Sequence, residues 1–257
     1  MTLAFSAPPR PQSLVSRLDP RWRLAALLFA AGVAATLHTL PAAGCALAAA
    51  LLLAFLARLP PRWFFERLAA LAVFLALFTL PLPWLLDGNG PGWSFGPVRF
   101  SLHGLAVALL LSAKAVTIVT LFLVIQATAP LESTLKAAHA LRVPGLLVQL
   151  GLLSYRYLFV LADELARLRI ALRVRGYRNR ANQHSYRTVG HVAGTLLVRG
   201  YERAERVSQA MRCRGFDGRF RSLTAFTTHP SDVLAFLLVT AGAAAVAAWD
   251  WLPRLSR

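Results

Sequence analysis

The sequence is poor in acidic residues and in cysteine, and its total fraction of charged residues is low. Of its 257 residues, 11 are Asp or Glu and two are Cys, and charged residues make up 15%. Soluble domains usually carry about 25% charged residues, so the composition argues against an ordinary soluble domain. The two cysteines, Cys45 and Cys213, indicate neither a disulfide framework nor a thiolate metal site.

Several patterns of catalytic and nucleotide-binding sites are also missing. The sequence has no GxxxxGK[ST] phosphate loop, so we do not expect the chain to bind ATP itself. The histidines show no ligand spacing such as HExxH, and no nucleophile and base stand together. The six histidines are His38, His103, His139, His184, His191 and His229. We therefore expect no catalytic residue, no metal ligand and no cofactor in this chain.

The sequence is rich in long apolar runs. Hydrophobic residues make up 57% and the mean hydropathy is +0.55. A membrane-spanning helix needs about 20 apolar residues. The candidate spans are Leu24–Leu40, Ala42–Ala57, Leu68–Leu86, Leu102–Thr128 and Asp232–Trp251. We predict an all-α polytopic membrane protein with about five transmembrane helices.

The proline-containing and turn-forming segments between the runs agree with this assignment. We expect Pro41 in the turn between the first two spans and Pro81 and Pro83 near the end of the third. Asp87–Gly92 reads as a turn-rich loop before the fourth span. Tryptophans lie at the edges of the segments, as in the aromatic belts of membrane proteins. They are Trp84, Trp93, Trp249 and Trp251.

Basic residues predict the orientation of the spans. Arginines in the N-terminal tail, after the second span and after the fourth span place those loops in the cytoplasm by the positive-inside rule. They include Arg10, Arg17, Arg21, Arg23, Arg58, Arg62, Arg67 and Arg142, with Lys136. A sixth apolar stretch, Gly145–Leu161, would place the Arg-rich residues 167–221 outside if it crossed. We therefore predict that it begins a long helix along or under the cytoplasmic face, with the C-terminus outside.

These assignments divide the chain into three parts. Residues 1–128 form the N-terminal tail and four transmembrane helices, residues 129–222 a cytoplasmic coupling module, and residues 223–257 the last transmembrane helix and the C-terminus. The module is expected to hold three helices. They are Leu131–Val143, between Pro130 and Pro144, then Leu146–Arg175 and His191–Arg214.

One seven-residue phrase occurs twice in the module. Ala171-Leu172-Arg173-Val174-Arg175-Gly176-Tyr177 returns as Ala210-Met211-Arg212-Cys213-Arg214-Gly215-Phe216. Gly176 and Gly215 stand where a helix would end, because glycine adopts the left-handed terminal conformation without penalty. Arginine before such a glycine either complements the helix dipole near anionic lipid or offers a bidentate fork to a carboxylate of a partner. The repetition favours the second interpretation, a pair of docking tips.

Around this phrase the sequence resembles a known family. The segments that carry the resemblance are Pro130-Leu131, Leu141-Arg142-Val143-Pro144, Tyr155-Arg156-Tyr157-Leu158 with Glu164, and Ala210-Met211 with Arg214-Gly215-Phe216-Asp217-Gly218. Together they are similar to the transmembrane component of energy-coupling-factor transporters, the ABC-type importers of metal ions and vitamins. The Tyr-Arg-Tyr stretch and the last segment are most similar to the cobalt-type, CbiQ-like subgroup.

The resemblance implies a mechanism and partners. Arg175-Gly176 and Arg214-Gly215 would each dock on one of two ATP-binding subunits, and the long helices would transmit ATPase movement to a separate metal-binding membrane subunit in the bacterial inner membrane. The docking phrases also contain Ala171, Arg173, Ala210 and Arg212. Val174 and Cys213 stand where the family usually has Ala. Cobalt follows from the subgroup, with nickel or a vitamin as alternatives.

Two other functions compete with this one. The Arg-rich region could bind anionic lipid or nucleic acid, which predicts a salt dependence spread over many arginines. An intramembrane enzyme would use His103, Lys114 or His139. Lys114, near the middle of the fourth span, either faces the protein interior or contacts a membrane partner. Asp163 and Glu164 lie at helical spacing from Arg167, which predicts structural ion pairs.

Overall fold

A computed structural model describes residues 13, 15, 18–85, 92–95, 98–216 and 228–255. The described part of the chain forms two compact units, one built from α7 and α8 and the other from the remaining elements. The expected loop Asp87–Gly92, apart from Gly92, lies outside the described residues. So do Asp217-Gly218 and the expected boundary between residues 222 and 223.

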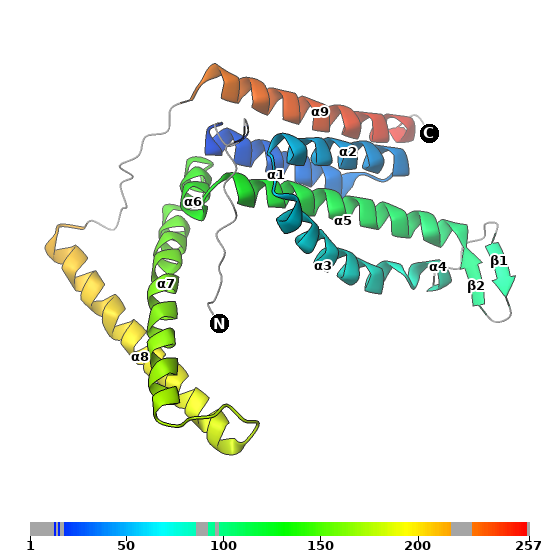
Figure 1. Ribbon diagram of the computed structural model, residues 1–257. Coiled ribbons are helices and arrows are strands. Elements are labelled where there is room, and N and C mark those ends of the chain that lie inside the picture. The colour runs from blue at the N-terminus through cyan, green and yellow to red at the C-terminus, as the bar shows by residue number, and fades with distance from the viewer. Residues whose placement is uncertain are drawn as a thin grey trace. The chain divides into compact units, whose positions relative to one another are not determined.

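The larger unit is a bundle of long helices, drawn in Figure 1 with α6 at one end and a β-hairpin at the other. Its elements are α1 (Pro20–Thr36), α2 (Leu40–Leu56), α3 (Pro61–Thr79), α4 (Leu82–Leu85), β1 (Gly92–Phe95), β2 (Val98–Ser101), α5 (Leu102–Thr128), α6 (Leu131–Ala140) and α9 (Pro230–Leu255). The smaller unit consists of α7 (Gly145–Val174) and α8 (Gln183–Cys213). The all-α class is confirmed; the antiparallel β1–β2 hairpin is a small addition to it.

Some helix ends differ from the sequence prediction. Pro41 lies in the first turn of α2 rather than in the preceding turn, because proline fits there, where its missing N–H has no partner to lose. The third helix ends at Thr79, and Pro83 belongs to the separate turn α4. Helix α8 begins at Gln183, not at His191, because the Asn182 side chain accepts a hydrogen bond from the Ser185 N–H and caps it.

One apolar cluster fixes the α6 end of the bundle. It joins the start of α1, the end of α2, the start of α3, the end of α5 and the middle of α6. Its members include Leu24, Leu27, Ala54, Ala57, Phe64, Val124, Ile125 and Ala137. Consecutive long helices therefore run in opposite directions between the α6 end and the hairpin end (Figure 1).

Small side chains form much of the contact between the helices of the bundle. Ala26, Ala34, Ala42, Ala43 and Ala50 are almost completely buried. Alanine lets helix backbones approach closely, which is how helices associate in a membrane where lipid is as apolar as leucine. Leucine and phenylalanine point outward instead: Leu77 of α3 and Phe55 of α2 are 74% and 83% exposed in the isolated chain.

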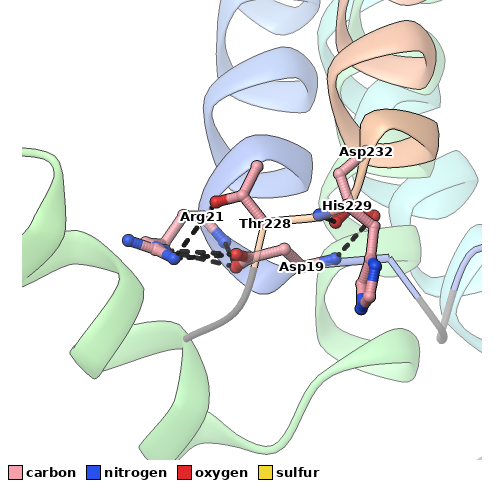
Figure 2. A network of polar contacts seen from close by, with 5 residues as sticks. All are labelled: Asp19, Arg21, Thr228, His229 and Asp232. Atoms are coloured by element: carbon pink, nitrogen blue, oxygen red, sulfur yellow. Dashed lines mark hydrogen bonds and ion pairs between the residues drawn. The ribbon is translucent and has the colours of Figure 1, made fainter. Parts of the chain in front are cut away.

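Carboxylates pin α9 to α1 at the α6 end (Figure 2). The buried Asp232 carboxylate accepts hydrogen bonds from the Asp19 N–H, at 3.2 Å, and from the His229 N–H, at 2.9 Å. Asp19 in turn caps α1 and forms an ion pair with Arg21, 3.0 Å between Oδ2 and Nη2. The Arg21 guanidinium also reaches Thr228, next to α9.

A third carboxylate joins the same two helices at the hairpin end. Asp250, near the end of α9, accepts hydrogen bonds from the His38 N–H at 2.8 Å and the Thr39 N–H at 2.9 Å. The Thr39 hydroxyl donates to Asp250 as well. Since α1 and α9 meet start to start and end to end, they run parallel, although more than 200 residues separate the paired groups.

The charged side chain of Lys114 has a hydrogen-bond partner within the bundle. Its Nζ donates a hydrogen bond of 3.1 Å to the Ala35 carbonyl in the last turn of α1. That carbonyl belongs to the negative end of the α1 dipole and has no partner within the helix. The contact therefore supports an internal structural role for this intramembrane charge.

Four helical segments are long and apolar enough to cross a membrane among the described residues. They are Pro61–Trp84, Leu102–Thr128, Gly145–Val174 and Pro230–Leu252. The set differs from the five predicted spans: α1 and α2 have 17 residues each, about 26 Å at 1.5 Å per residue, against a hydrocarbon core of about 30 Å. Seventeen residues are still within the short limit of known spans, and α2 is a shorter apolar helix by composition.

Candidate functional site

The two repeated phrases lie at the C-terminal ends of α7 and α8, which cross each other (Figure 1). Glu164 of α7 holds the crossing: it pairs with Arg167 of its own helix, at 3.0 Å, and with Arg199 of α8. Glu164 lies in the C-terminal half of α7, which is more polar than the half before it. Hydrogen bonds from Arg167 and Arg199 lower the pKa of the Glu164 carboxyl. Of the two predicted partners of Arg167, Glu164 is the one that binds it.

The first Arg-Gly phrase ends α7 in a Schellman turn. Arg175 is the last residue near helical geometry, with φ −78° and ψ 8°, and Gly176 follows at φ 79°. The Gly176 N–H donates to the Arg173 carbonyl and the Tyr177 N–H to the Leu172 carbonyl, both at 3.0 Å. These two reverse bonds satisfy carbonyls that the helix leaves without partners.

The second phrase ends α8 in the same way. Arg214 has φ −90° and ψ 12°, and Gly215 has φ 75°. The Gly215 N–H donates to the Arg212 carbonyl at 3.0 Å, and the Phe216 N–H to the Met211 carbonyl at 3.1 Å. The prediction that both glycines end helices in the left-handed conformation is therefore confirmed.

The two copies of the phrase also have the same pattern of solvent exposure. In each copy the apolar second residue and the aromatic seventh residue are half-buried, and the other five are exposed. The exposed predicted residues are Ala171, Arg173, Arg175, Gly176, Ala210, Arg212, Arg214 and Gly215. Neither the Arg175 nor the Arg214 guanidinium has a side-chain partner among the residues that the structure describes. The structure thus presents two matching cationic helix ends to the surroundings.

The two ends are well separated. Helix α8 begins seven residues after Gly176 and ends beside Gly215, so its own length spans most of the path between them. Its 31 residues extend over about 46 Å at 1.5 Å per residue. The two Arg-Gly ends are therefore separated by about one length of α8.

The first end opens on a groove that the sequence did not predict. A cavity of about 460 Å³ lies between the last turns of α7 and the first turns of α8. Leu165, Leu172, Val189 and Val192 form its apolar wall, and the residues Arg169, Arg173, Tyr177, Asn179 and Thr188 complete its lining. The Tyr177 hydroxyl donates to the Asn179 side chain at 3.4 Å, which fixes the turn beside the groove.

Two aromatic residues of the repeat were not selected as site residues from the sequence. Tyr177 and Phe216 supply the N–H that closes each helix end, and both are half-buried. An apolar residue at this position commonly packs on the residue five places earlier, here Leu172 and Met211. The matched aromatic residues of the two phrases were the signal that could have identified them.

The carboxylates that join α1 and α9 were not identified from the sequence, for a different reason. Asp19, Asp232 and Asp250 are each less than 7% exposed, yet no motif links them. In a chain with 11 acidic residues, three that stand at apolar helix ends were the available signal.

No group of three or more His, Cys, Asp or Glu in the described residues could hold a metal ion. The six histidines are all among these residues. The expectation that the cargo ion is held elsewhere stays a prediction.

Comparison with known proteins identifies the family. The family model CbiQ, described as cobalt transport protein, matches residues 11–237. The chain belongs to the CbiQ family. This match covers α1 to α8 and the start of α9, including both Arg-Gly phrases.

Relatives place this CbiQ-family chain among the energy-coupling-factor transporters. It is 32% identical to the cobalt transport protein CbiQ of Rhodobacter capsulatus. The 222 aligned residues cover 84% of this chain and 85% of that protein. It is 26% identical to the energy-coupling factor transporter transmembrane protein EcfT of Streptococcus equi, over 88% of this chain and 89% of that one. The nickel permease LarQ of Lactiplantibacillus plantarum is 30% identical, over 62% of this chain and 51% of that one.

The family and the apolar helices together establish the coarse function. The chain is a multi-pass membrane protein and the transmembrane component of an energy-coupling-factor type transporter. Such components are generally not catalytic.

Proposed function

We propose that this chain is the coupling subunit of a cobalt importer. Its two Arg-Gly helix ends dock on two cytosolic ATP-binding subunits, and α7 and α8 transmit the ATPase movement to a separate metal-binding membrane subunit. The observation that carries this proposal is the pair of matching Schellman turns, each formed at an exposed arginine that has no side-chain partner among the described residues.

The chemistry of these ends suits docking. Arginine offers five donors in a planar fork that pairs with a carboxylate in two places. The glycine that follows has no side chain and ends the helix, so a partner groove can close around the tip. Arg173 and Arg212 stand one residue before Val174 and Cys213 and add a second cation to each tip.

The bundle supports the orientation that this function needs. At its α6 end lie basic residues of α1, of the α2–α3 junction and of the α6 segment. They are Arg21, Arg23, Arg58, Arg62, Arg67, Lys136 and Arg142. By the positive-inside rule this end faces the cytoplasm of a bacterial inner membrane, with the N-terminus on that side.

The parallel arrangement of α1 and α9 bears on whether α7 crosses the membrane. Helix α7 has the length and composition of a span. However, α6 and the start of α9 share one end of the bundle, so the chain between them must cross an even number of times. Helix α8 is not among the apolar candidates. A single crossing by α7 is therefore incompatible with the two carboxylate contacts, and we place α7 and α8 on the cytoplasmic side.

The choice of cargo follows the relatives. The matching family model and the Rhodobacter capsulatus relative are named for cobalt transport, and LarQ for nickel. We propose cobalt, with nickel as the second candidate. Uptake of radiolabelled Co²⁺ by cells that carry this chain and its partners, with excess Ni²⁺ as competitor, separates the two: strong competition by Ni²⁺ would favour nickel.

Co-purification tests the docking. Arg175→Glu and Arg214→Glu should each weaken ATPase association, because a carboxylate replaces the cation in one of two contacts. The double variant should lose it almost completely, since removal of both contacts also removes their avidity. The ATPase that remains bound to the affinity-tagged full chain is the measurement.

Arg187→Glu is the matched control for this experiment. Arg187 is exposed, lies on α8 and stands outside both phrases. It should retain ATPase binding at the level of the unmodified chain. Loss of binding in the control to the same degree as in Arg214→Glu would indicate diffuse charge attraction, and full binding by the double variant would refute docking at the tips.

A further inference from the structure

A second cavity lies inside the bundle, away from the Arg-Gly ends. It has a volume of about 460 Å³ and is bounded by α1, α2, α5 and α9, with the segment before α1 at its edge. Its wall is mostly apolar: Leu27, Leu53, Leu56, Val124, Phe236 and Val239 are among the lining residues. All of these stand in the part of their helix nearest the α6 end.

One buried cation lines this cavity. Arg23 of α1 is 6% exposed, so nearly its whole side chain is removed from solvent. Within the described residues its guanidinium makes one hydrogen bond, from Nη1 to the Val15 carbonyl at 2.9 Å. A guanidinium has five donors, so several Arg23 N–H groups are not used by the hydrogen bond to Val15.

The nearby carboxylates do not use this capacity. Asp19 directs its oxygens to the backbone and side chain of Arg21, at 3.0 to 3.4 Å. Asp232 accepts from the Asp19 and His229 backbone N–H groups. Figure 2 shows the Asp19 carboxylate on Arg21 and the Asp232 carboxylate on the backbone of Asp19 and His229. Asp232 also lines the cavity and the Asp19 charge acts on Arg23, but neither carboxylate accepts a hydrogen bond from the Arg23 side chain in the described residues. Arg23 therefore keeps donors for an additional anion.

We propose that this cavity binds one anionic lipid, with its phosphate on Arg23 and an acyl chain against the apolar wall. The α6 end is the proposed cytoplasmic end, where the leaflet carries anionic lipid, and basic pockets between transmembrane helices on that side bind such headgroups. A free phosphate would satisfy Arg23 but would leave the apolar wall uncovered. The bound lipid would fill the junction of α1 and α9 beside the contacts of Figure 2.

This inference rests on the proposed orientation but not on the docking of ATPases, and its test is independent of them. The full-length chain in neutral detergent is titrated with phosphatidylglycerol or phosphatidylcholine, and bound lipid is counted by native mass spectrometry. We expect one phosphatidylglycerol to be retained in preference to phosphatidylcholine. Arg23→Gln should reduce its retention about ten-fold, as loss of a charge-assisted hydrogen bond predicts.

Two matched pairs of variants control the experiment. Arg62→Gln removes an exposed cation from the same end of the bundle and should leave retention unchanged. Val239→Phe fills the cavity without changing charge and should reduce retention, whereas Leu237→Phe, on the 58% exposed side of the same helix, should not. Helix content and thermal unfolding of each variant identify any that fail to fold, and the Val239 pair then decides alone.

Three results would overturn the proposal: equal retention of the two lipids, unchanged retention in folded Arg23→Gln or Val239→Phe protein, or displacement of the lipid by inorganic phosphate. Arg23→Gln protein should still bind ATPases through its unaltered tips. Loss of lipid with ATPase binding intact thus separates this inference from the coupling function.

Discussion

The bundle and the α7–α8 pair use the same types of residue in opposite ways. In the bundle, alanines are buried, and three carboxylates are hidden at helix ends where they accept backbone hydrogen bonds. In the α7–α8 pair, Val148 is the buried residue of α7 and Ser185 that of α8, and the cations point outward. The bundle therefore buries many of its own side chains, whereas most side chains of the pair are exposed or half-buried in the isolated chain.

The largest difference between the two regions is expected in their rates of amide hydrogen exchange. In lipid, amides in α5, where Thr117, Thr120 and Val124 are almost fully buried, should exchange far more slowly than those in the last turn of α8. Addition of the ATPases should slow exchange by at least about ten-fold in the last turns of α7 and α8, since about 1.4 kcal/mol of local stabilisation gives that factor. Protection spread evenly over both helices would instead indicate docking along their length.

A carboxylate removed from each region should give the next largest difference. Asp232→Ala leaves two backbone N–H groups at the α1–α9 contact without their acceptor and should lower the free energy of unfolding by about 2 kcal/mol. Asp163→Ala, in the exposed part of α7, should change it little. Denaturant or thermal unfolding of the full chain in detergent measures both, and equal effects would contradict the distinction.

Substitutions at left-handed residues should have opposite signs in the two regions. Gly176→Ala places a side chain at φ 79° and should destabilise the end of α7 by about 1 kcal/mol. Arg58 already occupies a left-handed position at φ 49° after α2, with the same pair of reverse hydrogen bonds. Arg58→Gly should therefore stabilise the bundle by about 0.5 kcal/mol. Local exchange rates at the two helix ends are the measurement.

The smallest effect is expected at the crossing of α7 and α8. Glu164→Gln removes its pairs with Arg167 and Arg199, which lie at the surface. Because those cations lower the folded-state pKa of Glu164, their contribution is present at neutral pH and is lost as pH falls through that lowered pKa. Distances between spin labels on α7 and α8 should broaden in the variant at pH 7 and in the unmodified chain at acid pH. Unchanged distributions would show that Glu164 does not hold the crossing.

Much of the site was readable from the sequence because it is local. The glycine after each arginine, the apolar residue before it and the aromatic residue after it lie within seven positions, which is the range of a helix-end motif. The bounds of α5 and the existence of every long helix were also predicted, since apolar runs set them. The start of α8 was placed too late because the Asn182 cap precedes a polar first turn without apolar periodicity.

By itself, the sequence determined the apolar helices, the gathering of basic residues at one end of them and the two Arg-Gly helix ends, because hydropathy, charge and turn chemistry act over short stretches of chain. Only the tertiary structure decided that α9 lies parallel to α1, that Asp232 and Asp250 join them, and that Arg23 faces a cavity. Those features depend on side chains more than 200 residues apart, and no local preference specifies which of several similar apolar helices will pack together.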